Sequence, residues 1–263
     1  MNESDGAELL REDLGEGVAR LTLNRPGARN ALSAALLDSL GAALEHIAAD
    51  EAVHAVVIRG AGPAFCAGHD LREMQALPDE AARRALFARC GAVMQAVRGL
   101  PQPVIAQVHG VATAAGCQLV ATCDLAVAAD DARFATPGVN IGLFCTTPSV
   151  ALSRTVSGKH ALEMLLTGDL IDADTAWRFG LVNRLAPAAE LEAATLELAR
   201  RVASKSRHVV ALGKAAYHRQ AELDEGTAYD YASGVMAENL AAADAAEGIA
   251  AFLGKRRPEW RNA

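Results

Sequence analysis

Two short stretches of the sequence decide the fold: AFCAGHDL at residues 64–71 and HGVATAAGCQL at residues 109–119. Each stretch follows a predicted buried strand, one a continuous apolar run at residues 55–58 and the other at residues 104–108. Both stretches are rich in Gly and Ala, so that a ligand or a neighbouring segment can approach the backbone closely. The sequence therefore predicts two small-residue loops, each at the end of a buried strand.

The segments around these loops alternate between strand and helix patterns. Further strands are predicted at residues 18–23 and 125–128. One helix is predicted after Ser33, which fits an N-cap, because Leu36, Leu40, Leu44 and Ile47 form one apolar stripe. Two more helices are expected over residues 79–98 and 115–123. Strands that alternate with helices in this way indicate an α/β architecture of stacked β-β-α turns.

The pattern changes after residue 148, where the strand signal nearly vanishes and only residues 182–185 retain it. Residues 188–253 are almost entirely helical in pattern. We therefore divide the chain into an α/β core that contains both loops, residues 1–187, and a helical C-terminal region, residues 188–263. Apolar positions in that region lack following strands that would cover them, which indicates oligomerisation. These positions include Leu191, Leu196, Leu198, Val209, Val210 and Leu212.

Composition excludes several classes of function. The chain of 263 residues carries a formal net charge of −7, which argues against a nucleic-acid-binding surface. No apolar run is long enough to cross a membrane. The five scattered cysteines show no metal-ligand spacing, so no metal site is predicted, and they indicate reduced thiols. Together with an acidic N-terminus unlike a targeting peptide, they predict a cytoplasmic protein.

The two loops together, about forty residues apart, resemble the signature loops of the enoyl-CoA hydratase/isomerase (crotonase) family. The resemblance extends over residues 18–257. Residues 112–120 and 134–140 are most similar to the subgroup typified by the enoyl-CoA hydratase domain-containing protein 3. The resemblance to the family implies the crotonase (ClpP/crotonase-like) fold, a spiral of β-β-α units. It also implies that the C-terminal helices join chains into a homotrimer or a dimer of trimers.

The resemblance also implies how a CoA thioester would bind. Reactions of this family pass through a thioester enolate, whose oxygen would be held by the backbone N–H groups of His69 and Ala115. Coenzyme A would enter as part of an acyl-CoA or enoyl-CoA substrate, with no permanently bound cofactor. The residues implied in coenzyme contacts are Ala67, Asp70 and Leu71 near adenine and pantetheine, and Arg25, Phe252 and Lys255 near the ribose phosphate.

The chain departs from the family pattern where hydration chemistry is performed. In the hydratases two glutamates hold a water molecule and exchange protons, and the matching positions here are Gln118 and Gly138. A glutamine amide does not accept a proton at physiological pH, and glycine has no side chain. Ordinary enoyl-CoA hydration is therefore expected to be very slow. Asp70 and the imidazole of His69 remain candidates for proton transfer, whereas Cys145 fits a structural thiol.

Two functions remain open. One is a lyase- or isomerase-type enzyme of fatty acid metabolism that needs the oxyanion hole alone, through isomerisation, decarboxylation or thioester hydrolysis. The other is a non-catalytic acyl-CoA-binding protein. An acid, a base or an ordered water near the acyl α- and β-carbons favours the enzyme, and a wholly apolar pocket favours the binding protein.

Overall fold

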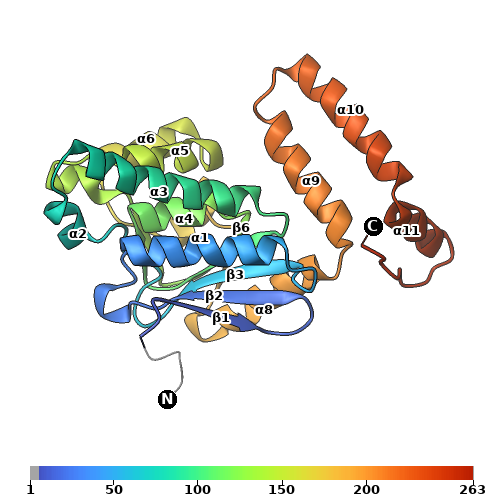
Figure 1. Ribbon diagram of the computed structural model, residues 1–263, viewed down its shortest axis with the longest axis horizontal. Helices are drawn as coiled ribbons and strands as arrows, with labels where there is room; N and C mark the ends of the chain where they lie inside the picture. The colour runs from blue at the N-terminus through green and yellow to red at the C-terminus, as the bar shows by residue number, and fades with distance from the viewer. Residues whose placement is uncertain (1–5, 263) are drawn as a thin grey trace.

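A sheet of six strands forms the centre of the structure, a computed structural model that describes residues 6–262 (Figure 1). The strand order is β1-β2-β3-β4-β6-β9; β1 is antiparallel to β2 and every other pair is parallel. These strands are β1 (Leu9–Asp13), β2 (Val18–Leu23), β3 (Ala55–Gly60), β4 (Val104–Val108), β6 (Leu125–Ala129) and β9 (Arg184–Ala186). A second sheet has the order β5-β7-β8 and is made of β5 (Val111–Thr113), β7 (Arg133–Ala135) and β8 (Ile171–Asp172).

Helices enclose the main sheet. The helices α1 (Ala34–Ala48), α3 (Glu80–Gly99) and α4 (Ala115–Thr122) pack together, and in Figure 1 the sheet lies between them and α8 (Leu191–Ala203). Helix α8 contacts β2, β3, β4, β6 and β9. The other elements of the core are η1 (Pro26–Ala28), α2 (Leu71–Ala76), η2 (Pro137–Ile141), α5 (Thr146–Thr155), α6 (Gly158–Thr167), α7 (Ala173–Phe179) and η3 (Ala188–Glu190).

The first helix shows how local sequence determines these elements. The side chain of Ser33 caps α1 by accepting a hydrogen bond of 3.0 Å from the Leu36 N–H. The predicted stripe of Leu36, Leu40, Leu44 and Ile47 is completely buried against the core. The strands predicted over residues 18–23 and 104–108 are also present with the same bounds. The predicted α/β architecture is confirmed.

Several short strands were not expected from the sequence. Strand β1 lies at the edge of the sheet and alternates poorly, because its last three residues are exposed and charged. Strands β5, β7 and β8 have only two or three residues, too few for a periodic pattern. Strands β5 and β7 directly follow β4 and β6, which are neighbours in the main sheet and place them side by side. Strand β8 follows α6 and pairs antiparallel with β7.

The last three helices form a lobe that projects away from the sheet (Figure 1). They are α9 (Arg207–Gln220), α10 (Glu225–Ala241) and α11 (Ala243–Leu253), and α9 and α10 contain no buried residue. The division of the chain into two regions between residues 187 and 188 remains a prediction. Helix α8 belongs to the C-terminal region but packs on the main sheet. The expectation for Leu191 and Leu198 was wrong, because the sheet leaves them only 4% and 7% exposed.

One buried carboxylate ties this lobe together. Asp244 is 1% exposed and accepts hydrogen bonds from the backbone N–H groups of Arg261 (2.6 Å) and Asn262 (2.9 Å). It also accepts from the hydroxyl of Ser206, the residue that caps α9 by accepting from Val209 N–H. Asp244 therefore joins the start of α9, the start of α11 and the end of the chain.

We expect the substitution Asp244→Ala to lower the free energy of unfolding by about 2–3 kcal/mol, because it leaves buried donors without an acceptor. Burial raises the pKa of Asp244, but the hydrogen bonds from Ser206 and from the two backbone N–H groups outweigh it and hold the pKa below its usual value. The stabilisation is therefore fully present above the unfolded pKa of about 3.9 and is lost as pH falls through the folded pKa.

Denaturation curves from about pH 7 to pH 3 at fixed protein concentration measure this effect. The exposed Asp230 in α10 provides a matched control, since Asp230→Ala removes the same charge without a buried network. Equal destabilisation by the two substitutions would contradict the role of Asp244.

Candidate functional site

The two small-residue loops lie directly against each other. Cys66 forms an isolated parallel bridge with Ala112, in which its N–H donates to Val111 O (3.2 Å) and its carbonyl accepts from Thr113 N–H (2.9 Å). The hydroxyl of Thr113 donates to Ala67 O at 3.1 Å. These bonds fix residues 64–71 beside the start of α4.

Two glycines allow this close approach. A Cβ on Gly116 would lie 2.1 Å from the carbonyl oxygen of Cys66, a distance that no side chain can occupy. Gly68 has a φ of +96°, and a Cβ there would lie 2.8 Å from Ala114 Cβ and 3.3 Å from Ala115 N. The absence of side chains at these two positions therefore brings the backbone of the first loop next to the first N–H of α4.

The N–H groups predicted to form the oxyanion hole have no protein acceptor among the hydrogen bonds of residues 6–262. On either side of His69, Gly68 O accepts from Leu32 N–H (2.7 Å) and Asp70 N–H donates to Leu32 O (3.2 Å), so that the His69 N–H stays free. Ala115 is the first residue of α4, where helical N–H groups lack partners and the dipole favours negative charge.

Backbone strain marks the same position. Ala114 adopts a φ of 50° and a ψ of −118°, a sparsely populated conformation for a residue with a side chain. Its N–H donates to Ala135 O (2.9 Å), which anchors the turn to β7. The chain maintains a strained residue directly before a free N–H, an arrangement that is common at functional sites.

The two positions at which the resemblance implies glutamates differ in structure. Gln118 lies one helical turn after Ala115 and is 4% exposed, and its Oε1 has no hydrogen-bond partner among the described residues. Gly138 is closed to any side chain, because a Cβ there would lie 2.5 Å from Leu143 O and 2.8 Å from Cys145 Sγ. Glutamate at position 138 would therefore require movement of residues 143–145.

Asp70 is occupied by structural bonds. Its carboxylate caps α2 by accepting from the N–H groups of Arg72 (3.0 Å) and Glu73 (3.4 Å), and it accepts from Arg25 Nη2 at 3.0 Å. Burial raises the pKa of Asp70, but these hydrogen bonds outweigh it and lower the pKa. Arg25 is also held by Glu8 at 2.9 Å, so that its charge is balanced within the chain.

The thiols around the loops are buried and resist ionisation. Burial raises the pKa of Cys66 and the pKa of Cys117 each to about 12, and burial also raises the pKa of Cys145. All five cysteines are unpaired. These thiols are therefore neutral near pH 7 and do not act as nucleophiles there.

The imidazole of His69 has a different environment. It packs edge-on against Phe87 of α3, with 5.5 Å between ring centroids, and neither Nδ1 nor Nε2 has a hydrogen-bond partner among the described residues. Burial lowers the pKa of His69, and the Leu32 backbone beside the ring opposes the shift only in part, without a contact that meets hydrogen-bond geometry. The ring is therefore neutral near pH 7.

The predicted coenzyme contacts do not all come together in one chain. Ala67, Asp70 and Leu71 lie at the first loop and the start of α2. Phe252 is 82% exposed at the end of α11, with Lys255 just beyond, and Figure 1 shows α2 and α11 at opposite ends of the molecule. If these residues share a site, the second group comes from another copy of the chain.

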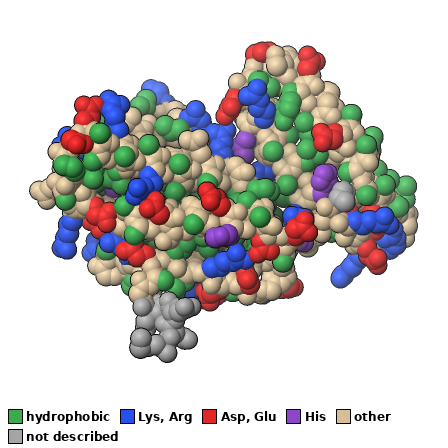
Figure 2. Space-filling view, in the orientation of Figure 1, with side chains coloured by type: hydrophobic (Ala, Val, Ile, Leu, Met, Phe, Trp, Pro, Cys, Tyr) green, Lys and Arg blue, Asp and Glu red, His purple; other side chains and the backbone are tan. Residues whose placement is uncertain are grey.

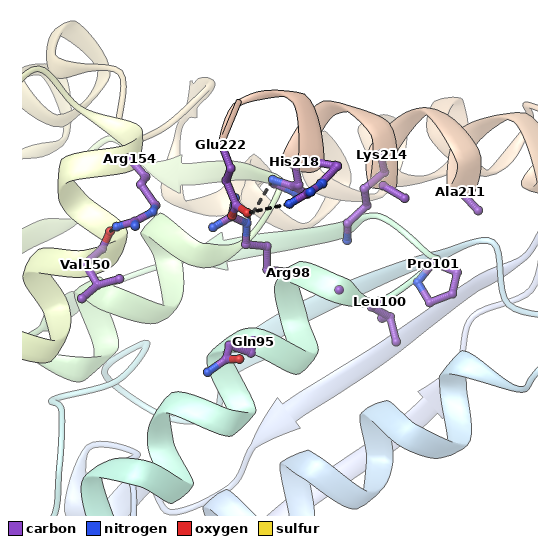
Figure 3. A pocket seen from close by; sticks show the side chains of 13 residues that line it. Gln95, Arg98, Leu100, Pro101, Val150, Arg154, Ala211, Lys214, His218 and Glu222 are labelled. Atoms are coloured by element: carbon purple, nitrogen blue, oxygen red, sulfur yellow. Dashed lines mark hydrogen bonds and ion pairs between the residues drawn. The ribbon is translucent and has the colours of Figure 1, made fainter. Parts of the chain in front are cut away.

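A cleft of about 640 Å³ lies elsewhere, between α3, α5 and α9, and contains none of the predicted site residues (Figure 3). Its polar groups bond one another: Arg98 donates to His218 (3.2 Å) and pairs with Glu222 (3.3 Å), while Lys214 pairs with Asp124 at 2.6 Å. We interpret this cleft as part of the interface between α9 and the core, where these contacts hold α9 in place.

Two other classes of site were searched for in residues 6–262. No group of three or more His, Cys, Asp or Glu side chains is arranged to hold a metal ion there. No helix in this described range has the length and apolar character needed to span a bilayer.

The contact between the loops predicts the effect of one added methyl group. We expect Gly116→Ala to lower the free energy of unfolding by about 3 kcal/mol, since the Cys66 carbonyl must move. Gly91, inside α3 with open space around it, is the matched control, and Gly91→Ala should stabilise the protein by about 0.5–1 kcal/mol. Denaturant titration measures both effects, and a neutral Gly116→Ala would show that the loops are not in contact.

Comparison with known proteins identifies the family. The family model described as enoyl-CoA hydratase/isomerase matches residues 13–263. The chain is 49% identical over 245 residues to the enoyl-CoA hydratase domain-containing protein 3, mitochondrial, of Mus musculus, covering 93% of this chain and 82% of the mouse protein. The predicted resemblance to the domain-containing protein 3 subgroup is thereby confirmed.

Two solved structures extend the match to the fold. An enoyl-CoA hydratase from Mycobacterium smegmatis superimposes with a TM-score of 0.94 at 54% identity, covering 96% of this chain and 98% of that one. The human enoyl-CoA hydratase domain-containing protein 3 gives a TM-score of 0.93 at 48% identity, covering 96% of this chain and all of the human structure.

The expectation of a cytoplasmic protein is contradicted by these comparisons. The mouse, rat and human relatives, at 48–49% identity, are all named mitochondrial. The expectation rested on charge and on unpaired thiols, which report on surface and redox chemistry rather than on an address within the cell. The family model and the relatives, each matching most of the chain, show that it belongs to the enoyl-CoA hydratase/isomerase family.

Proposed function

We propose that this protein binds acyl-CoA thioesters and stabilises the enolate of the thioester with the N–H groups of His69 and Ala115. The observation that supports this is the pair of unbonded N–H groups on two loops in direct contact. Two converging donors suit the carbonyl oxygen of a thioester, on which negative charge develops. Loss of one such donor typically lowers a rate by about 10²–10³.

The proposal covers reactions that develop an oxyanion at the thioester carbonyl, as an enolate or as a tetrahedral intermediate, without the glutamate pair. Double-bond isomerisation, decarboxylation and thioester hydrolysis all develop charge on the carbonyl oxygen, and coenzyme A would enter and leave with the substrate. Ordinary hydration is excluded from the proposal, because Gln118 does not exchange protons and Gly138 has no space for a side chain. The Mycobacterium smegmatis relative is named an enoyl-CoA hydratase, but this chain has glutamine at position 118 and glycine at position 138. A shared fold therefore does not assign hydration to this chain.

A non-catalytic acyl-CoA-binding protein is the alternative. It is favoured by the state of Asp70, a candidate proton-transfer group whose carboxylate is bound to the N–H groups at the start of α2 and to Arg25. Burial raises the pKa of Cys145, which fits the structural thiol expected there. The choice between enzyme and binding protein therefore depends on His69, the remaining candidate.

We also propose assembly into a homotrimer or a dimer of trimers, in which α11 of one copy brings Phe252 and Lys255 to the coenzyme site of another. Apolar side chains remain exposed on the C-terminal lobe, and Figure 2 shows hydrophobic side chains over this lobe. They are Tyr217, Tyr229, Met236, Leu240, Ile249, Phe252 and Leu253. A second patch on the core contains Ile141, Leu143, Phe144, Val150, Leu162 and Leu166. Contact between different patches is heterologous, and a closed ring satisfies every copy.

The first prediction from this proposal concerns the binding of acyl-CoA. We expect calorimetry to detect butyryl-CoA binding and the substitution Ala115→Pro to weaken it at least tenfold, because proline at the first helical position removes the N–H of residue 115. Circular dichroism and thermal denaturation establish that the variant is folded. A folded variant with unchanged affinity would remove Ala115 from the site, and absent binding across several acyl lengths would refute the proposal.

The second prediction concerns hydration. Purified protein should hydrate crotonyl-CoA several orders of magnitude more slowly than a homologue with both glutamates, since each positioned acid–base group contributes about 10²–10⁴ in rate. Absorbance of the enoyl thioester reports the reaction directly. Hydration at an ordinary rate would show that another pair of groups activates water.

The third prediction concerns assembly. Light scattering at micromolar concentration should give the mass of three or six chains. The substitution Leu240→Lys, at an exposed apolar position of α10, should weaken the assembly, whereas Glu238→Lys, at an exposed polar position of the same helix, should not. A stable monomer would contradict both the assembly and the placement of Phe252 and Lys255.

A further inference from the structure

The His69 imidazole is the least satisfied polar side chain among the described residues. Seven buried side-chain nitrogen and oxygen atoms lack a hydrogen-bond partner in residues 6–262, and two of them are Nδ1 and Nε2 of this one ring. A buried polar group without a partner destabilises the folded state. A ring that needed only to fill space could be phenylalanine, which would also pack edge-on against Phe87.

The position of residue 69 suggests a function for the two unbonded ring nitrogens. The same residue carries one of the two free N–H groups, so a thioester oxygen bound there lies about 3 Å from the His69 backbone. The α-carbon of the acyl group is two covalent bonds from that oxygen. A side chain of residue 69 therefore starts within reach of the carbon at which an enolate forms.

Other titratable groups near the loops are already occupied. Asp70 caps α2 and pairs with Arg25, Cys66 and Cys117 are fully buried thiols, and Cys145 packs against Gly138. His109, the histidine of the second loop, is held through Nε2 by Gly62 O at 2.8 Å. Because these groups are bound or neutral, His69 is left as the group that can take up a proton near pH 7.

We propose that the imidazole of His69 exchanges protons with the α-carbon of the bound acyl group, in place of the two missing glutamates. This inference rests on the proposed binding of acyl-CoA thioesters at the same site. It names the proton-transfer group of that site and separates an enzyme from a binding protein.

The step balances with the groups present. An unprotonated ring nitrogen of His69 removes a proton from the α-carbon; the C–H bond breaks, an N–H bond forms, and the electron pair moves onto the thioester oxygen. The N–H groups of His69 and Ala115 hold this enolate. The imidazolium then returns the proton to the α-carbon, or to the γ-carbon of an unsaturated acyl group. In D₂O the imidazolium exchanges its proton with solvent and returns deuterium.

The ring can turn toward the ligand at low cost. Neither ring nitrogen has a hydrogen bond to break, and the ring gives up only its edge-on packing against Phe87. Both nitrogens are buried in the unliganded chain, so binding of the acyl group must accompany a rearrangement of the ring or of α3.

Deuterium uptake by butyryl-CoA in D₂O, followed by mass spectrometry, tests the proposal. Butyryl-CoA is saturated, so hydration and isomerisation do not interfere. We expect the protein to catalyse exchange at the α-carbon and His69→Phe to slow it about 10²–10⁴-fold, with butyryl-CoA affinity in calorimetry within about threefold of the original. His69→Phe should also raise the melting temperature, because it removes two orphaned nitrogens.

A matched control separates proton transfer from packing. Gln107 in β4 has a buried Oε1 that also lacks a partner, so Gln107→Leu relieves the same kind of penalty and should leave the exchange rate unchanged. If His69→Phe does not fold, His69→Gln tests the same loss. Binding without exchange in the original protein, or equal exchange in a folded His69 variant, would overturn this inference alone. Absent binding would overturn the proposed function as well.

Discussion

The close approach of two backbone segments, residues 64–68 and the first turn of α4, is the constraint on which the site depends. The hydrogen of Gly116 faces the carbonyl oxygen of Cys66, where a methyl group would lie 2.1 Å away. This contact sets the distance between the N–H groups of His69 and Ala115, and the Cys66–Ala112 bridge fixes its direction. The main sheet and its helices can be understood as the frame that delivers both loops to this contact.

Much of this frame could be predicted from the sequence, because long elements repeat their pattern. The stripe of Leu36, Leu40, Leu44 and Ile47 predicted α1, and two small-residue loops predicted where the site lies. The three-residue strands β5 and β7 could not be predicted, since pairing rather than periodicity creates them. The covering of Leu191 and Leu198 was missed for a related reason: a helix stripe shows that a face is buried, but not whether the chain's own sheet or another copy buries it.

The backbone of the candidate site could be predicted from the sequence better than the partners of its side chains could. The replacements at Gln118 and Gly138 can be read directly from the sequence, but the closure of position 138 by Leu143 O and Cys145 Sγ requires the fold. Asp70 pairs with Arg25, which lies 45 positions away in the sequence. Because of this pairing, the Asp70 carboxylate holds the structure together and is not available as an acid. Sequence patterns assign residue types to a site, whereas the partners of those residues decide which protons can move.

The loss of the glutamates and the orphaned imidazole support each other. A scaffold that had lost all catalysis would gain stability from an apolar residue at position 69, because nothing in the described chain bonds the ring nitrogens. The chain instead combines three unfavourable features on the two contacting loops: strain at Ala114, an unbonded Gln118 oxygen and the unbonded His69 ring. Local penalties that gather at one site, beside two free N–H groups, are the physical mark of a site that a ligand completes.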